Sequence, residues 1–302
     1  MTRILEYTVQ ETKVKAEIFL KAQGFSTRLI TELKYLEEGI TRNGQKIFTN
    51  EFLYKDEVIR IALPIGETSE GIVPTELPFP IVYEDEDIVV VDKPSGMAIH
   101  PSQGNFLSTL ANAALFHYQQ KGIPFVFRAI NRLDKDTSGL LVLAKHSLSA
   151  CILSEDMKNR AIHRTYLAIV LGETEQHGTI DAPIARVADS TIERCVDFSR
   201  GARAVTHYDT VYQEKVGDDT YSLVSAKLET GRTHQIRVHF SYINRPLLGD
   251  FLYNPNFEKI KRQALHSHIL QFVHPISKEM MVFSSNLPQD MLSCFVNCCK
   301  FV

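Results

Sequence analysis

The sequence lacks the features that mark several classes of protein. None of its hydrophobic runs approaches the length needed to cross a bilayer, and its start, MTRILEYTVQETK, has no apolar core of the kind found in secretory signals. Its five cysteines are odd in number and irregularly spaced, which argues against a disulfide framework. We therefore expect a cytoplasmic protein that does not bind membranes.

The sequence also lacks a glycine-rich nucleotide loop, a Cys-x-x-Cys redox pair and a cluster of metal ligands. Cys294, Cys298 and Cys299 lie close together, but this tail has no histidine that could complete a metal site. We instead expect these cysteines on the apolar side of a last helix, together with Met291, Leu292, Phe295 and Val296. The chain is thus expected to hold no metal and no cofactor.

The chain also has no excess of positive charge, with 33 lysines and arginines against 36 aspartates and glutamates. The net charge is −3 and the pI is near 6.4, so no overall positive field would attract a nucleic acid, and any such contact must come from a local group of cations. With 302 residues the chain is long enough for one large domain and one small one. Nothing in the sequence indicates an oligomer, and a monomer is the default expectation.

The most informative stretch present is residues 130–145, INRLDKDTSGLLVLAK. Its second half is a near-continuous apolar run, typical of a strand buried on both faces. Asp134 and Asp136 come directly before this strand, and they form either a structural ion-pair corner or a catalytic site. The order D-x-D-x-T also matches phosphatases that form an aspartyl-phosphate with Mg²⁺, but there the apolar strand precedes the motif, whereas here it follows.

Two further strings combine cations with polar or aromatic residues. HRTY, residues 163–166, starts a predicted strand, and a tyrosine in such a place is most often a core aromatic with its hydroxyl at the surface. GRTHQIRVH, residues 231–239, predicts a turn and then a helix that begins at Thr233. Two arginines and two histidines are costly at a buried helix start unless an anion lies opposite; otherwise they are surface residues.

The pattern divides the chain into a small domain, residues 1–65, a linker, residues 66–80, and a large domain, residues 81–302. In the small domain Gly24 ends a first helix, Ser26 caps a second and Gly39 ends it, while Asn43-Gly44 predicts a hairpin turn. Residues 58–64 alternate as an edge strand would. The linker is rich in proline, glycine and glutamate, which predicts that the small domain moves on the large one.

In the large domain the pattern predicts two short strands within residues 81–93, helices within 109–120 and 147–162, and a hairpin within 264–285. Residues 131–145 resemble the string HRLDxxTSGLLxLAK of the RluA/RluD-like pseudouridine synthases, with Asn131 where the family usually has histidine. Other family marks follow in the same order along nearly the whole chain: Lys93-Pro94, HPS, HRTY, GRTHQIRVH and LGD. The resemblance implies an α+β pseudouridine synthase fold with a mixed, mostly antiparallel central sheet flanked by helices and loops.

The resemblance also implies roles for particular residues. Asp134 corresponds to the family's nucleophile, and Arg237 to the arginine that keeps this carboxylate ionised and oriented. Tyr166 corresponds to the tyrosine whose ring stacks on the target base, and it is a candidate for late proton removal. Arg132 and Arg164 are expected to contact the substrate.

The small domain resembles the S4 RNA-binding module, in the order GFSxRxIT, GIxxNG and a closing strand, with Lys55-Asp56 in place of the usual Gly-Asp. This resemblance implies that Arg28, Lys34 and Arg42 contact RNA phosphates.

Together, the two resemblances imply an enzyme that isomerises a specific uridine to pseudouridine in structured RNA. Ribosomal RNA is favoured over transfer RNA because S4 modules accompany ribosomal RNA enzymes in this family. The sequence leaves open whether Asp134 attacks C1′, adds to the base or removes a C2′ proton. Two alternatives are a non-catalytic RNA-binding protein on the same fold and an aspartyl-phosphate phosphatase that uses Asp134 and Asp136.

Overall fold

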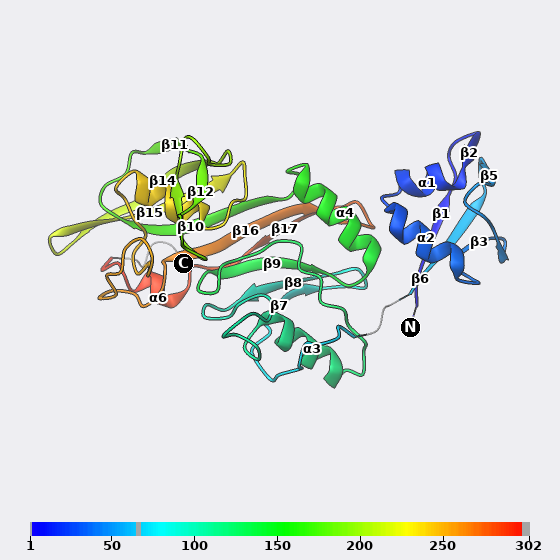
Figure 1. Ribbon diagram of the computed structural model, residues 1–302, viewed down its shortest axis with the longest axis horizontal. Helices are drawn as coiled ribbons and strands as arrows, with labels where there is room; N and C mark the ends of the chain where they lie inside the picture. Colours follow the sequence, from blue (N-terminus) through cyan, green and yellow to red (C-terminus); the bar gives the residue numbers. More distant parts are fainter. Residues whose placement is uncertain (1, 65–67, 298–302) are drawn as a thin grey trace.

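The computed structural model describes residues 2–64 and 68–297. Figure 1 shows a small N-terminal domain at one end of an elongated molecule, a long sheet through the middle, and the strands β11, β14 and β15 at the other end. Each part has its own cluster of buried hydrophobic residues.

The N-terminal domain packs two helices on a small sheet. Its elements are β1 (Thr2–Thr8), β2 (Lys13–Lys15), α1 (Ala16–Ala22), α2 (Thr27–Tyr35), β3 (Ile40–Arg42), β4 (Gln45–Lys46), β5 (Phe52–Tyr54) and β6 (Val58–Pro64). The predicted cap is confirmed, because the Ser26 hydroxyl accepts a hydrogen bond from the backbone N–H of Leu29 at 3.2 Å. The predicted hairpin turn is also confirmed, with φ of 52° at Asn43 and 75° at Gly44.

Two local predictions in this domain are wrong. The strand β6 is internal, in the order β1-β6-β3-β4, because β1 pairs along its full length. The second helix ends at Tyr35, well before Gly39. Gly39 is needed for a different reason: a Cβ at this position would lie 2.0 Å from the carbonyl oxygen of Leu33. The glycine therefore allows the chain to pass close to the helix end.

The large domain is built on one nine-stranded sheet with the order β11-β14-β15-β10-β16-β9-β8-β7, and β17 pairs with β16. Among the strands described, only β9 and β16 pair in parallel, so the expected mixed, mostly antiparallel sheet is confirmed. Its strands are β7 (Ile81–Glu84), β8 (Ile88–Lys93), β9 (Ser138–Ala144), β10 (His163–Leu171), β11 (His177–Asp181), β14 (Val205–Val216), β15 (Asp219–Leu228), β16 (Leu265–Val273) and β17 (Met280–Ser284). A separate ribbon joins β12 (Ile184–Arg186) and β13 (Arg194–Val196).

Helices cover both faces of this sheet. The helices are α3 (Leu110–Gln120), α4 (Ser147–Lys158), α5 (Gln235–Tyr242) and α6 (Gln289–Leu292). Every residue of β9 is buried, with Leu141 and Leu143 in the cluster that includes α3 and α5, and Leu140 and Val142 in the cluster that includes Leu153 of α4. The prediction of a strand buried on both faces is thus confirmed.

The segment between the two domains lies against the large one. Backbone hydrogen bonds join Ser69 to Phe125 and Thr75 to Asn112, so this part of the expected linker follows α3. The N-terminal domain also touches α4, because Leu148 is fully buried in its core cluster and Ile152 packs on the same cluster. Movement of the small domain would have to break these contacts, and it stays a prediction.

Near the C-terminus the expected last helix is only four residues long, Gln289–Leu292. Cys294 and Phe295 are buried just beyond it, whereas Val296 is 73% exposed, so the apolar side predicted for this region does not reach that residue. Cys298 and Cys299 lie outside the described residues. Among the described helices, none is long and apolar enough to cross a bilayer.

Candidate active site

Asp134 lies in the short loop that leads into β9. The backbone of this loop accepts hydrogen bonds from two basic side chains. Lys93, fully buried at the end of β8, donates from Nζ to the carbonyl oxygen of Lys135 at 2.9 Å, and burial lowers the pKa of this lysine to about 7. Arg262 donates to the carbonyl oxygen of Asp136 at 3.3 Å. The carboxylate of Asp134 therefore extends from a fixed backbone.

Asn131, which replaces the family's histidine, is 2% exposed. Its side-chain oxygen accepts a hydrogen bond from the backbone N–H of Val142 at 3.1 Å. Its Nδ2 has no hydrogen-bond partner among the described residues. The side chain thus joins the loop before β9 to the middle of that strand and does not line the cavity at Asp134.

Arg237 connects this loop to α5. Its side chain is 1% exposed, and its NH1 donates to Oδ2 of Asp134 at 2.9 Å. Two parallel hydrogen bonds, of 2.7 and 2.8 Å, join the same guanidinium to Asp250. Burial by itself would lower the pKa of Arg237, but the hydrogen bonds and charges of Asp250 and Asp134 raise it instead. The guanidinium stays charged and faces Asp134 in a fixed geometry.

Asp250 is a further member of the site that was not predicted from the sequence. This carboxylate is fully buried, and its Oδ1 also accepts the backbone N–H groups of Leu252 and Tyr253, at 3.1 and 3.3 Å. The string Leu248-Gly249-Asp250 is the feature of the sequence that could have indicated Asp250. Its Gly249 has φ of 64°, and a Cβ there would lie 2.2 Å from the carbonyl oxygen of Arg262.

His234 was also missed. It precedes α5, which starts at Gln235, two residues later than predicted, and its φ of 58° turns the ring back toward the loop. Nε2 lies 3.7 Å from Oδ2 of Asp134, and Nδ1 lies 3.2 Å from the hydroxyl of Tyr253. That hydroxyl accepts the backbone N–H of Arg194, so its own hydrogen is available for Nδ1. This arrangement places the ring proton on Nε2, toward Asp134.

Burial lowers the pKa of His234 despite the neighbouring charge of Asp134. Burial also raises the pKa of Tyr253 to about 12. Both rings are therefore neutral near pH 7, and the charged pair at the site is Asp134 with Arg237.

These residues surround a cavity between the loop, β10 and α5. The structure brings Asp134, Tyr166, Arg237 and the exposed Arg132 to its wall. Its remaining lining residues are Leu133, Thr137, Leu228, Arg232, His234, Gln235, Ile236 and Leu265. Tyr166 is 5% exposed, and its hydroxyl lies 3.5 Å from NH1 of Arg164. Arg164 itself does not line the cavity. A wall that combines the Tyr166 ring and several aliphatic side chains with the Asp134–Arg237 ion pair and other polar groups suits a flat, uncharged ring with a reactive bond near Asp134.

The structure does not bring Arg28, Lys34 and Arg42 to this cavity, because all three lie in the N-terminal domain. The Arg28 side chain is 91% exposed and pairs with Glu32 on the same helix. The Lys34 ammonium lies 5.1 Å from the ring centroid of Tyr35. Arg42 is held inside the domain by Glu57 and Glu51, at 3.2 and 3.4 Å.

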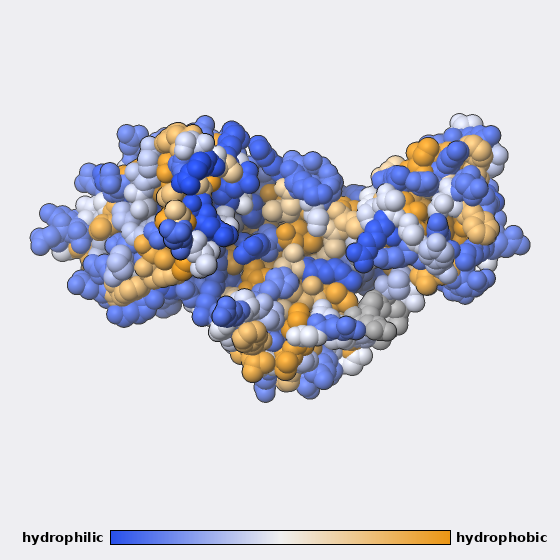
Figure 2. All heavy atoms as spheres, viewed as in Figure 1, coloured by the Kyte–Doolittle hydropathy of each residue, from blue (hydrophilic) through white to orange (hydrophobic). Residues whose placement is uncertain are grey.

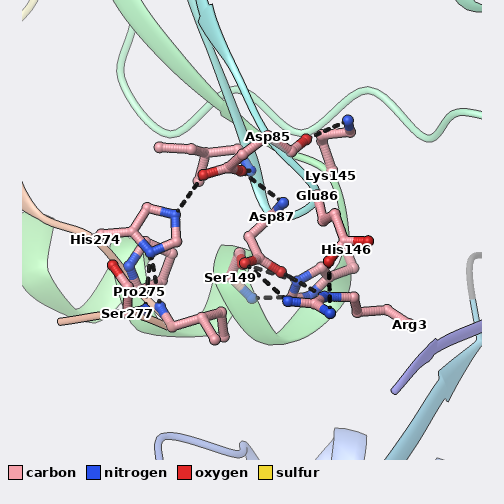
Figure 3. Close-up of polar contacts among 12 residues, drawn as sticks. Arg3, Asp85, Glu86, Asp87, Lys145, His146, Ser149, His274, Pro275 and Ser277 are labelled. Carbon is pink, nitrogen blue, oxygen red and sulfur yellow. Dashed lines mark hydrogen bonds and ion pairs between the residues drawn. The ribbon is translucent and has the colours of Figure 1, made fainter. Parts of the chain in front are cut away.

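Within residues 2–64 and 68–297, one group of side chains has the composition of a metal site: Asp85, Asp87 and His274. Figure 3 shows that its ligand atoms already have protein partners. Asp87 accepts from Arg3 and from His146, each at 2.9 Å. Nδ1 of His274 accepts backbone N–H groups, which places its proton on Nε2, 2.9 Å from Asp85. With its proton on Nε2 and its Nδ1 lone pair in use, His274 offers no free lone pair to a metal, so this group is a network of hydrogen bonds and ion pairs within the protein.

Comparison with known proteins shows the family of this chain. Residues 87–242 match the model of the RNA pseudouridylate synthase family. The chain belongs to that family. It is 41% identical to the uncharacterized RNA pseudouridine synthase YjbO of Bacillus subtilis over 269 residues, which cover 89% of this chain and 93% of that protein. It is 40% identical to the ribosomal large subunit pseudouridine synthase D of Zymomonas mobilis, over 88% of each chain.

Solved structures agree with this assignment. The human RNA pseudouridylate synthase domain containing 1 superposes with a TM-score of 0.61 at 26% identity, covering 76% of this chain and 90% of that one. The protein is therefore an RNA pseudouridine synthase, an isomerase that converts uridine to pseudouridine in RNA. The two alternatives, a phosphatase and a non-catalytic RNA-binding protein, are not favoured. A phosphatase of the D-x-D-x-T type would have its apolar strand before the motif, whereas here the strand follows Asp134 and Asp136.

Proposed function

We propose that this pseudouridine synthase modifies a uridine of ribosomal RNA, and that Asp134 is its nucleophile. The single observation that carries the catalytic part is the 2.9 Å contact between Asp134 and the buried Arg237 at the wall of the cavity. The ribosomal target is supported by relatives such as the ribosomal large subunit enzymes of Zymomonas mobilis and Pasteurella multocida, at 40% and 39% identity. A cytoplasmic location stays a prediction.

The reaction breaks the N1–C1′ bond of uridine, turns the uracil over and joins its C5 to C1′, so that substrate and product are isomers. It requires an anion near C1′, a surface that holds the detached uracil, and an acceptor for the C5 proton. In the described residues no hydrogen bond reaches Oδ1 of Asp134, so this oxygen is available to the nucleotide. Attack at C1′, addition to the base and removal of a C2′ proton are all compatible with this position.

Tyr166 supplies the surface for the uracil, because its ring lines the cavity next to Asp134. Stacking of a base on an aromatic ring is worth about 1–3 kcal/mol. The Tyr166 oxygen, as the phenolate paired with the guanidinium of Arg164 3.5 Å away, takes up the C5 proton late in the reaction and so becomes the neutral hydroxyl. Because C1′ is hidden in a stacked nucleotide, the uridine must first leave the helix. The exposed Arg132 at the cavity wall contacts the displaced strand.

In this proposal the N-terminal domain is an S4-like RNA-binding module. Arg28 and Lys34 lie on its helix α2 and contact phosphates; the side chain of Arg28 is 91% exposed, and Lys34 is half-buried in the last turn of the helix. Arg42 holds Glu51 and Glu57 together inside the domain and contributes to binding only through that structure.

The experiment is to map pseudouridine in ribosomal and transfer RNA from cells with and without the protein. Loss of a single ribosomal site, restored by the wild-type protein and not by Asp134→Asn, is the expected result. Asp136→Asn is the matched control, since this neighbouring carboxylate is absent from the cavity wall. Loss of a transfer RNA site instead would reject the ribosomal target, and restoration by Asp134→Asn would reject the nucleophile.

A further inference from the structure

A two-stranded ribbon of the N-terminal domain exposes lysine and aromatic side chains side by side. In the antiparallel pair of β2 and β5, Lys13 faces Tyr54 and Lys15 faces Phe52. Because side chains alternate along a strand, these four share one face, while Leu53 points into the core of the domain. We call the four residues the ribbon face. Figure 1 shows this ribbon at the side of the small domain that is remote from the central sheet.

The two rings of the ribbon face are accessible to a ligand. Phe52 is 41% exposed and Tyr54 is 47% exposed. The ammonium of Lys13 lies 4.2 Å from the centroid of the Phe52 ring and 6.0 Å from that of Tyr54, and the ammonium of Lys15 lies 5.9 Å from Phe52. Two aromatic rings and two cations within such distances form the combination that binds single-stranded nucleic acid.

The charge of the ribbon face is positive. Arg42 binds both Glu51 and Glu57, the two glutamates that flank β5, and offsets one of their two negative charges, so that with Lys13 and Lys15 the local sum stays positive. Neither Lys13 nor Lys15 forms an ion pair with any residue that the structure describes. Their charges are therefore available to an anionic partner, although the chain as a whole has a net charge of −3.

We propose that the ribbon face binds a single-stranded segment of the substrate RNA, away from the target uridine. Bases stack on Phe52 and Tyr54, and the lysines bind the phosphates of the same segment. Base stacking on an aromatic ring is stronger than an exposed cation–π contact, so a base displaces the ammonium from the ring. The flexible lysine side chain then carries its charge to the phosphate.

A second contact of this kind would favour long RNA substrates. One RNA molecule held at both the cavity and the ribbon face binds more tightly than at either alone, because the second contact forms within the complex. The inference rests on the RNA substrate of the family and on no particular choice of RNA.

The test uses the full-length protein and a fluorescent oligoadenylate, which contains no uridine for the cavity. Phe52→Leu with Tyr54→Leu removes the aromatic faces and keeps apolar side chains. We expect at least about tenfold weaker binding, measured by fluorescence anisotropy. Lys13→Gln with Lys15→Gln should reduce the slope of log affinity against log salt by about 1.4. The ratio of kcat/KM for a long RNA to that for a short stem-loop should fall in both double variants.

Val58→Ala is the control, because it shortens a side chain of the same domain that is 44% exposed and lies outside the ribbon face. Its affinity should equal that of the wild type, and thermal unfolding should show all variants folded. Failure of the wild type to bind oligoadenylate, or equal binding by the leucine variant, would overturn the proposal. So would a leucine variant that binds RNA normally and loses activity only on ribosomal particles, since this indicates a protein partner. A missing ribosomal pseudouridine would instead reject the target and leave the binding result intact.

Discussion

Two clusters in this molecule have the same ingredients: a carboxylate, an arginine from a distant part of the chain and a histidine. At the cavity these are Asp134, Arg237 and His234. Between the domains they are Asp87, Arg3 and His146. The interdomain carboxylate accepts hydrogen bonds on both oxygens and is 7% exposed, whereas Asp134 is 28% exposed and leaves Oδ1 without a bond among the described residues.

The difference in exposure and hydrogen bonding between Asp87 and Asp134 shows that the same three residue types do not by themselves leave a carboxylate oxygen available. In the interdomain cluster every carboxylate oxygen is used, so the cluster can only hold the domains together. At the cavity the arginine is bound twice to Asp250 and once to Asp134, so its position does not depend on Asp134. Figure 2 shows apolar side chains gathered in the recess over the middle of the central sheet, and a mixture of hydrophilic and apolar ones over both ends of the molecule. The low-dielectric surroundings strengthen the remaining charge interactions.

The largest expected effect is that of Asp134→Asn. It removes the anion and keeps the shape of the side chain, so we expect turnover to fall by about 10³-fold or more. The free energy of unfolding should change little, because Arg237 keeps its two hydrogen bonds to Asp250. Single-turnover formation of pseudouridine and urea denaturation measure the two quantities. A variant with near-normal turnover would contradict the assignment.

Arg237→Met should reduce both activity and stability. It leaves the fully buried Asp250 without its partner, at a cost of about 3–5 kcal/mol in the free energy of unfolding. The double variant Arg237→Met with Asp250→Asn removes the buried charge as well, and should regain much of the stability without regaining turnover. Stability that stays low in the double variant would show that the guanidinium has a further structural role.

Asp87→Asn should reduce stability without changing turnover. Burial alone would raise the pKa of Asp87, but the hydrogen bonds from His146 and Arg3 outweigh it and lower the pKa to about 2. Relative to an unfolded value near 3.9, this contributes about 2 kcal/mol at pH 7.

Because this folded pKa is lowered, the contribution is complete above the unfolded pKa and is lost as the pH falls from about 4 toward 2. Denaturation across this range should show a smaller pH dependence in the variant than in the wild type. Part of the dependence should remain, since the pKa of Glu84 is also lowered to about 2. An unchanged pH dependence would mean that the interdomain ion pair forms only weakly.

The smallest effect concerns the two histidines. His234→Gln keeps a polar side chain near Asp134 but loses the ring proton directed at it, and we expect about a tenfold decrease in kcat. His146→Gln, in the interdomain cluster, is the comparison and should affect the unfolding midpoint instead. Equal effects on kcat from both variants would remove the distinction between the clusters.

The sequence by itself determined the elements that depend on neighbouring residues. The buried strand β9 follows from an unbroken apolar run, and the hairpin after Arg42 from Asn43-Gly44. The motif strings also indicated Asp134 and Arg237, because residues that act together keep a recognisable local context. Apart from that one pair, which the family resemblance implied, such signals are local and do not say which distant segments meet.

Only the tertiary structure decided the contacts between distant parts of the chain. The pairing of β1 with β6, the partnership of Arg237 with Asp250, and the use of Arg42 inside the N-terminal domain all join residues without a shared periodicity. Which carboxylate keeps a free oxygen depends on how many donors the fold brings to it. The number of donors around a carboxylate is set by packing in three dimensions. Asp87 receives donors on both oxygens, whereas Asp134, among the residues that the structure describes, receives them on Oδ2 only.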